Sequence, residues 1–192
     1  MLRPHLRKPQ ARINAPAAVF MGPRLRGDDM MIRFGLTVAA AVCVLDQALK
    51  LWLIFVYDLG SKGLVRLAPG IDLVLTWNTG ISYGLFPQDG AGGRWLLIAI
   101  KAMAAILLTI WLTRTQARLT ALALGLIIGG AIGNAIDRLV YGAVADFVLL
   151  SITTASSRFD WYVFNLADAA IVAGVIGLLY ESVIGDRAAK AP

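Results

Sequence analysis

The sequence has little of what disulfides and metal centres are built from. Its 192 residues include one cysteine, Cys43, and one histidine, His5. A single cysteine excludes a disulfide within the chain, and a lone histidine in a polar tail excludes the clustered ligands of a zinc peptidase such as H-E-x-x-H. We therefore expect neither a metal nor any other cofactor.

Charged residues are also scarce. They make up 16% of the chain, whereas 58% of the residues are hydrophobic, well above the share in soluble domains. The net charge of +6 is carried by Lys and Arg at the amino end and beside apolar runs, as in membrane proteins. We therefore expect a membrane protein in contact with lipids and without a nucleic-acid partner.

The apolar runs divide the chain into four predicted membrane spans. Each is close to the length that crosses a hydrocarbon core of roughly 30 Å. The predicted fold class is thus an all-α membrane protein with four transmembrane helices in one domain, residues 32–184. The four spans cover Ile32 to Tyr57, Trp95 to Leu112, Leu119 to Val140 and Tyr162 to Ile184.

The two ends of the chain read as tails. Residues 1–31 are basic, contain proline and lack periodicity, so we expect a disordered cytoplasmic tail, and residues 185–192 form a second, shorter one. Met30 and Met31 directly precede the first apolar run, which prompts the hypothesis that translation starts there.

Two longer connections, 58–94 and 141–161, are predicted to lie outside the membrane. In the first, IDLVLTWN and ISYGLF are rich in β-branched and aromatic residues and flank the turn at Asn78, Thr79 and Gly80. We therefore expect a small β-hairpin or sheet there. Most Lys and Arg residues fall on the opposite side, so both termini are predicted to be cytoplasmic by the positive-inside rule.

Several polar residues lie inside or beside the apolar spans, where each costs a few kcal/mol unless it is paired. At 1.5 Å per residue, the acidic residues of the first, third and fourth spans all come out in the outer part of the bilayer. A proton or ion pathway would instead spread them across its depth. The residues concerned are Asp46, Gln47, Lys50, Asn134, Asp137, Arg138, Asp146, Asn165 and Asp168.

Some of these residues also have a purely structural interpretation. The third and fourth spans both carry N-x-x-D, which places amide and acid on one helix face, and such groups often act as interhelical clamps. Asp46 and Lys50 lie one turn apart and are predicted to neutralise each other. The glycines at 125, 129 and 133 recur every fourth residue and predict close helix packing.

Asp146 and Asp168 suggest a catalytic function. Two carboxyl groups close together in a partly dry site do not both ionise easily, so one keeps a proton while the other accepts one from water. Such a pair can hydrolyse a peptide bond without a metal or a nucleophilic serine. The spacing alone leaves a transporter open, because acidic residues at a membrane edge also occur there.

Four segments, taken in order, resemble the motifs of the lipoprotein signal peptidase family, also called signal peptidase II. They are DQALK at 46–50, NTGISYGLF at 78–86, GNAIDRLVYGAVADF at 133–147 and FNLADAAI at 164–171. The chain departs from the usual pattern at Tyr83 and Ala145. The resemblance covers roughly residues 32–184.

The resemblance implies an aspartyl endopeptidase of the bacterial inner membrane with its active site near the outer face. Its substrate would be a diacylglyceryl prolipoprotein, cut just before the lipidated cysteine, and globomycin would bind in the same groove. We expect a monomer. Asp146 and Asp168 would be the catalytic pair, and the substrate-binding or supporting residues would be Asp46, Lys50, Asn78, Gly80, Asn134, Asp137, Arg138 and Asn165.

Two other functions remain possible from the sequence. A proton-coupled transporter or small channel would use the intramembrane Asp, Lys and Asn residues, although no internal duplication of spans is evident. A serine-lysine peptidase would use Ser82 or Ser151 with Lys101, although no local motif supports it.

Overall fold

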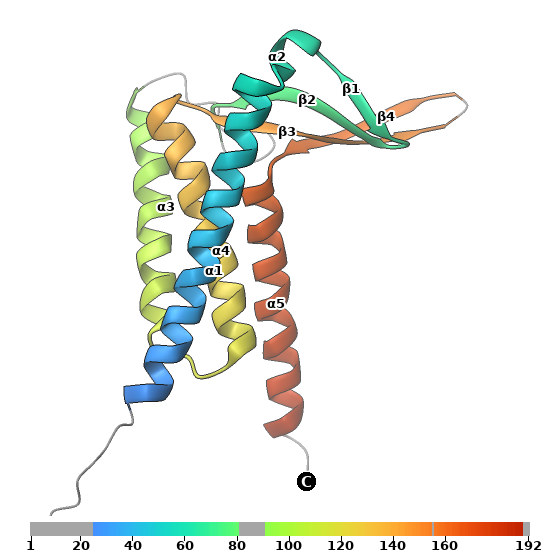
Figure 1. The fold of residues 1–192 in the computed structure, drawn as a ribbon. Coiled ribbons are helices and arrows are strands. Elements are labelled where there is room, and N and C mark those ends of the chain that lie inside the picture. The colour runs from blue at the N-terminus through green and yellow to red at the C-terminus, as the bar shows by residue number, and fades with distance from the viewer. Residues whose placement is uncertain (1–24, 81–90, 155, 190–192) are drawn as a thin grey trace, which may run out of the picture.

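The computed structural model describes residues 25–80, 91–154 and 156–189. Four long helices run side by side, with a small sheet across one end of them (Figure 1). The beginning of α1 and the end of α5 lie together at the other end of the bundle (Figure 1). The long helices are α1 (Leu25–Leu51), α3 (Ala91–Leu112), α4 (Arg118–Val140) and α5 (Leu166–Ala189).

The helices agree with the predicted spans in their apolar parts and differ at their ends. Helix α1 begins seven residues before the predicted Ile32, so residues 25–31 are helical rather than part of a tail, and it passes into a π-helix, η1 (Trp52–Val56). Helix α5 likewise extends to Ala189, beyond the predicted end at Ile184. Polar residues continue both helices because helical hydrogen bonding does not end at the apolar boundary.

Three helices among the described residues are long and apolar enough to cross a membrane. They cover Asp29–Val56, Arg118–Val140 and Leu166–Val183, and α3 contributes a shorter apolar stretch, Ile98–Leu112. The mostly helical membrane architecture is therefore confirmed, whereas the length and composition of α3 alone do not establish a fourth span.

Helix α4 is the centre of the bundle and packs against α1, α3 and α5. Its glycines explain how α1 comes so close. A Cβ added to Gly125 would lie 2.5 Å from the carbonyl oxygen of Gly35, and one added to Gly129 would lie 2.5 Å from that of Ala39. The predicted packing role of this glycine stripe is thereby confirmed.

The sheet contains four antiparallel strands in the order β1-β2-β3-β4. Two of them come from each outer connection, and the short helix α2 (Leu59–Lys62) precedes the first. Phe147 of the sheet forms a buried cluster with Leu53 of η1 and Leu59 of α2. The strands are β1 (Val65–Ala68), β2 (Ile71–Asn78), β3 (Val144–Thr153) and β4 (Arg158–Phe164).

The predicted small sheet is confirmed, and the predicted strand IDLVLTWN is its strand β2. Strand β2 pairs with β1 and β3, while ISYGLF at 81–86 lies outside the described residues. The second outer connection was predicted as a loop and instead forms β3 and β4. Tyr162, predicted to open the fourth span, lies in β4, because residues 158–164 continue the sheet before the helix begins.

Short connections join the sheet to the bundle. Strand β3 begins at Val144, four residues after α4 ends, and α5 begins at Leu166, two residues after β4 ends. Polar residues at these junctions are therefore held by a strand on one side and a helix on the other.

Candidate active site

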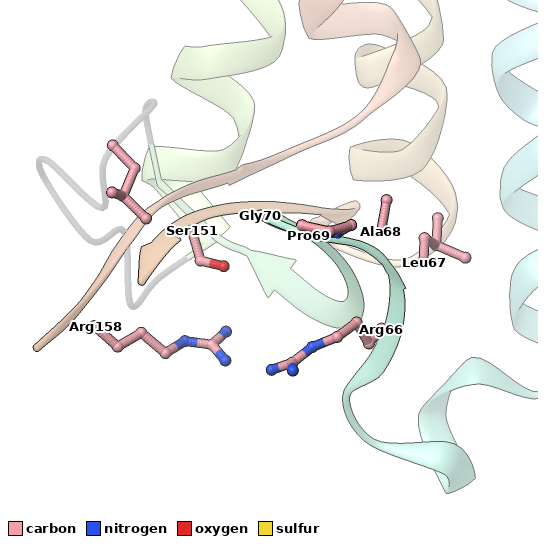
Figure 2. Close-up of a pocket in the computed structure, with 8 residues that line it drawn as sticks. Arg66, Leu67, Ala68, Pro69, Gly70, Ser151 and Arg158 are labelled. Atoms are coloured by element: carbon pink, nitrogen blue, oxygen red, sulfur yellow. The ribbon is translucent and has the colours of Figure 1, made fainter. Parts of the chain in front are cut away.

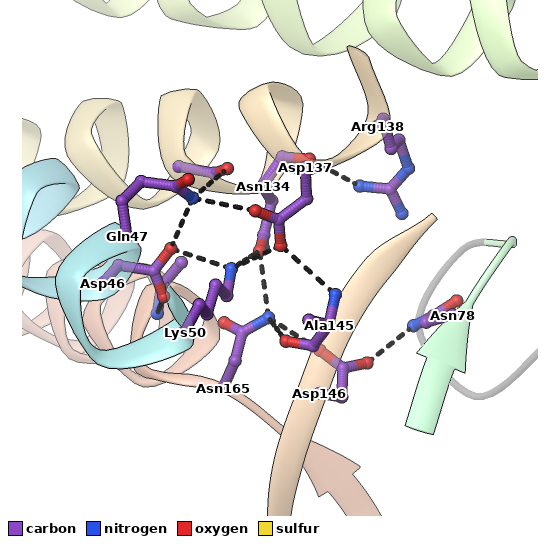
Figure 3. A network of polar contacts seen from close by, with 12 residues as sticks. Asp46, Gln47, Lys50, Asn78, Asn134, Asp137, Arg138, Ala145, Asp146 and Asn165 are labelled. Atoms are coloured by element: carbon purple, nitrogen blue, oxygen red, sulfur yellow. Dashed lines mark hydrogen bonds and ion pairs between the residues drawn. The ribbon is translucent and has the colours of Figure 1, made fainter. Parts of the chain in front are cut away.

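Asp146 lies near the start of β3, opposite Thr76 of β2, and is only 1% exposed. Each of its carboxyl oxygens accepts a hydrogen bond from a side-chain amide. Asn165 Nδ2 donates to Oδ1 at 2.6 Å, and Asn78 Nδ2 donates to Oδ2 at 3.1 Å (Figure 3). These two donors satisfy a carboxyl group that would be costly to bury alone.

Asp168 lies in the first turn of α5 and is partly exposed. It forms a reciprocal capping pair with Asn165: its backbone N–H donates to Asn165 Oδ1 at 2.9 Å, and its Oδ2 accepts from the backbone N–H of Asn165 at 3.4 Å. Asn134 Nδ2 donates to its other oxygen at 2.8 Å. The N-terminus of a helix favours a negative charge at this position.

Asn165 joins the two acidic residues. It is fully buried, and the same residue contacts Asp146 through its side chain and Asp168 through both its backbone and its side chain. The structure therefore brings together the two carboxyl groups that the sequence predicts as a pair.

The two carboxyl groups differ in their surroundings. Burial, and then the nearby charge of Asp168, raise the pKa of Asp146 to about 7, although the hydrogen bonds from Asn78 and Asn165 act in the opposite direction. Near neutral pH, Asp146 can therefore keep a proton. The pair is asymmetric, with a buried group that can be protonated beside a more exposed one at a helix N-terminus.

An ion cluster lies behind this pair in the bundle. Lys50 Nζ lies 2.8 Å from Asp46 Oδ2 and 2.7 Å from Asp137 Oδ2, and all three side chains are almost fully buried (Figure 3). The predicted pairing of Asp46 with Lys50 is confirmed, and Asp137 shares the same ammonium group. Lys50 also donates to Asn134 Oδ1 at 3.2 Å.

Both carboxylates of this cluster also bind the backbone beside the acidic pair. Asp137 Oδ2 accepts from the N–H of Ala145 at 3.2 Å, and Asp46 Oδ1 accepts from the N–H of Ala167 at 3.0 Å. Ala145 directly precedes Asp146, and Ala167 directly precedes Asp168. The ion cluster thus holds β3 and α5 at the residue before each acidic side chain.

Arg138 and Asn78 hold the peptide groups on either side of Gly80. Arg138 Nη2 donates to the Gly80 carbonyl oxygen at 2.8 Å, and Asn78 Oδ1 accepts from the Gly80 N–H at 3.1 Å. Gly80 is the last described residue before the segment 81–90. Every site residue predicted from the sequence therefore lies in one connected network around Asp146 and Asp168.

A cavity of about 240 Å³ opens beside Asp146. Its wall includes the end of β2 and part of β4, the two strands that flank β3 in the sheet. The residues that line it are Thr76, Trp77, Asn78, Thr79, Gly80, Asp146, Tyr162 and Val163.

Sequence reasoning missed two contributors. Gln47 Nε2 donates to Asp137 Oδ1 at 2.8 Å and to the Gly133 carbonyl oxygen at 3.1 Å, and its place in an apolar span was the available signal. The hydroxyl group of Tyr162 accepts from Asn78 Nδ2 at 2.9 Å. Its assignment to a membrane span hid this contact.

The described residues of the serine-lysine alternative lie in different elements. Ser151 lies in a groove at the far end of the sheet, lined also by Arg66 and Arg158 (Figure 2), whereas Lys101 belongs to α3 and is close enough to Asp168 and Asp146 for their charges to act on it. Ser82 lies outside the described residues. Within the described ranges, no cluster of three His, Cys, Asp or Glu residues suits a metal ion.

The chain is similar to proteins of a known family. Residues 38–184 match the family model described as signal peptidase (SPase) II. A lipoprotein signal peptidase of Nitrobacter hamburgensis is 60% identical over 84% of this chain and 98% of its own length, and one of Rhodopseudomonas palustris strain TIE-1 is 53% identical over the same shares.

A solved structure described as a bacterial membrane enzyme has the same fold. It superposes with a TM-score of 0.67 at 23% identity, covering 82% of this chain and 91% of the other. The family match spans most of the chain and includes all the site residues described above. The chain belongs to the signal peptidase II family and is a peptidase.

Proposed function

We propose that Asp146 and Asp168 form the catalytic pair with which this peptidase removes the signal peptide from diacylglyceryl prolipoproteins, just before the lipidated cysteine. The observation that carries the proposal is that Asn165 contacts both carboxyl groups. Two acidic groups of unlike surroundings, held together beside a cavity, are what general acid and base catalysis of peptide hydrolysis requires.

In the proposed reaction, the ionised Asp168 takes a proton from the attacking water. The protonated Asp146 hydrogen-bonds to the scissile carbonyl oxygen and stabilises the negative charge that develops there. When the tetrahedral intermediate collapses, the C–N bond breaks and the proton that Asp168 took from the water passes to the leaving amine nitrogen. The products are a signal peptide with a new carboxyl terminus and a lipoprotein with a free amino terminus. The raised pKa of Asp146, about 7, supports its role as the acid.

The same surroundings suit a substrate that arrives from the bilayer. The exposed surfaces of α1, α3 and α5 are apolar, so the lipid and the signal helix can remain in lipid while the scissile bond reaches Asp146. Asn78 and Gly80 line the cavity and are proposed to contact the peptide. Globomycin, the antibiotic implied by the family resemblance, would compete for this cavity.

We place the enzyme in the bacterial inner membrane as residues 32–184 with four spans, α3 being the fourth. The beginning of α1 and the end of α5 both lie away from the sheet (Figure 1), and most Lys and Arg residues belong to the segments at that end of the bundle. Both termini are therefore proposed to be cytoplasmic and the site to face outward. Both acidic residues belong to one chain, which supports a monomer.

The test uses purified protein with a diacylglyceryl prolipoprotein and the variants Asp146→Asn and Asp168→Asn. Each variant should lose roughly 10²- to 10⁴-fold in cleavage rate, the range for general acid or base catalysis. Globomycin should inhibit the parent enzyme. Asp58→Asn is the matched control, because Asp58 is exposed on the same side of the bundle and its left-handed backbone (φ 51°) suits Asn.

Normal cleavage by a well-folded Asp146→Asn or Asp168→Asn variant would remove that residue from the mechanism. Folding is checked by the unfolding temperature in detergent. A control variant as inactive as the two others would show that the loss reflects general damage.

A further inference from the structure

Tyr162 makes a contact that the proposed mechanism does not yet use. It lies on β4, and its hydroxyl oxygen accepts from Nδ2 of Asn78, at the end of β2, at 2.9 Å. Strand β3, which carries Asp146, lies between β2 and β4 in the sheet. The tyrosine therefore reaches across the catalytic strand to a residue on its other side.

Asn78 is one of the two donors to Asp146. Its amide nitrogen carries two protons, and the structure gives it two acceptors, Asp146 Oδ2 at 3.1 Å and the Tyr162 hydroxyl oxygen at 2.9 Å. Its amide oxygen accepts from the Gly80 N–H at 3.1 Å. Every hydrogen-bonding atom of this amide thus has a partner.

The partners also fix which way the amide points. The terminal torsion of asparagine is broad, so its amide plane can turn unless several contacts hold it. The Gly80 N–H requires an oxygen on its side, which turns Nδ2 toward Asp146. The Tyr162 hydroxyl oxygen then accepts a hydrogen bond from the second N–H of Asn78 and limits rotation about the terminal torsion of that side chain.

We infer that Tyr162 is a positioning residue of the catalytic pair. Its hydroxyl oxygen accepts one N–H of the Asn78 amide and so keeps the other N–H directed at Asp146, to which it donates a hydrogen bond. The inference rests on the proposed function of Asp146. Tyr162 also lines the cavity beside Asp146, so the tyrosine lies where the substrate would bind.

Tyr162→Phe removes the hydroxyl group and keeps the ring. We expect kcat to fall about three- to tenfold, the equivalent of one ordinary hydrogen bond, with little change in KM. The hydrogen bond from Asn78 lowers the pKa of Asp146, so a looser bond raises it. The acid must be protonated to act, and the alkaline limb of the pH profile should therefore move to higher pH.

A double-mutant cycle tests whether Tyr162 acts through Asn78. Tyr162→Phe, Asn78→Ala and the double variant are assayed for prolipoprotein cleavage from pH 5 to pH 9, on the order of the range over which Asp146 titrates. The double variant should cleave no more slowly than Asn78→Ala. Tyr57→Phe, a tyrosine on the outer end of η1 and outside the site, is the matched control and should behave like the parent.

Independent, multiplying losses would overturn the inference, as would a Tyr162→Phe enzyme with the parent's kcat and pH profile. A readout without substrate separates this from failure of the proposed function. The difference in unfolding temperature between each protein and its Asp146→Asn counterpart, followed against pH, reports the protonation of Asp146 whether or not it is catalytic. Tyr162→Phe should move that profile upward in pH, and an unchanged profile would contradict the positioning role.

Discussion

Two regions of the molecule bury aspartate side chains beside a cation, and the two ion clusters differ in which parts of the structure they hold in place. In the bundle, Asp46 and Asp137 share Lys50. In the sheet, the buried Asp72 lies 2.7 Å from Arg158 Nη2 and 3.5 Å from Arg66 Nε, and the two guanidinium groups face each other across the groove in Figure 2.

The difference lies in the remaining partners of each carboxylate. In the bundle, Asp46 and Asp137 also accept hydrogen bonds from backbone N–H groups next to the proposed catalytic pair. In the sheet, Oδ1 of Asp72 accepts no hydrogen bond from the described residues, and Arg66 is 68% exposed. One cluster therefore holds the backbone beside the two proposed catalytic residues, whereas the other joins strands at the rim of the molecule.

The largest effect is expected from Lys50→Met. It removes the cation shared by two buried carboxylates, and losing one partner of a buried pair costs about 3–5 kcal/mol of folding free energy. A shift of about 1 Å in the backbone beside Asp146 or Asp168 would lower activity about 100-fold. Unfolding in detergent and prolipoprotein cleavage measure the two effects.

Lys62→Met is the control for Lys50→Met. Lys62 is exposed and lies over the ring of Tyr57 at 3.8 Å, a contact of about 0.5–1 kcal/mol. Equal losses of stability and cleavage in Lys50→Met and Lys62→Met would mean that any lysine near this end of the bundle has the same effect. That result would contradict a special role for the cation that Asp46 and Asp137 share.

A change of pH should affect the catalytic end of the bundle next most strongly. Because Asp146, the proposed acid, has a pKa of about 7, cleavage should decline above that pH, about tenfold for each further unit. The unfolded chain releases this proton near its ordinary value of 3.8, so folding stability should fall as pH rises between the two values.

Asp146→Asn checks the origin of that stability change. The variant has no proton to lose at this position, so its stability should vary less over the same pH range. A parent enzyme that is fully active at pH 9, on the order of two units above the expected midpoint, would contradict the assignment of Asp146 as the acid.

The smallest effect is expected from Asp72→Asn. The change removes the charge between Arg66 and Arg158 but leaves an acceptor in place. Cleavage should change by less than about threefold, roughly 0.7 kcal/mol in the barrier, while the sheet becomes easier to unfold. A loss of activity as large as that of Lys50→Met would show that the sheet cluster also positions the catalytic pair.

The sequence was informative where one segment decides the outcome. The predicted third span, Leu119 to Val140, differs from α4 by one residue, because residues 121–133 are an unbroken apolar run and Arg118 and Tyr141 bound the segment. The convergence of Asp46, Asp137 and Asp168 also followed from helix rise alone. Both predictions need only local geometry and the thickness of a bilayer.

The sequence did not predict which distant segments pair with one another in the sheet. Strand β3 pairs with β2 some 70 residues earlier, and nothing within VADFVLLSIT specifies that partner. The backbone contacts of Ala145 and Ala167 were invisible because alanine has no polar side chain to signal them. Tyr162 was misassigned because an aromatic residue beside an apolar run suits a membrane interface as well as a strand.

The place of Asn165 in the chain has a consequence for biosynthesis. Asp46, Asp137 and Asp146 all leave the ribosome before it, and Asp168 follows three residues later. A nascent chain that ends before Asn165 carries Asp146 but neither Asp168 nor the amide that joins the two carboxyl groups. The proposed catalytic pair is therefore complete only after the first turn of α5, the last helix, has been made.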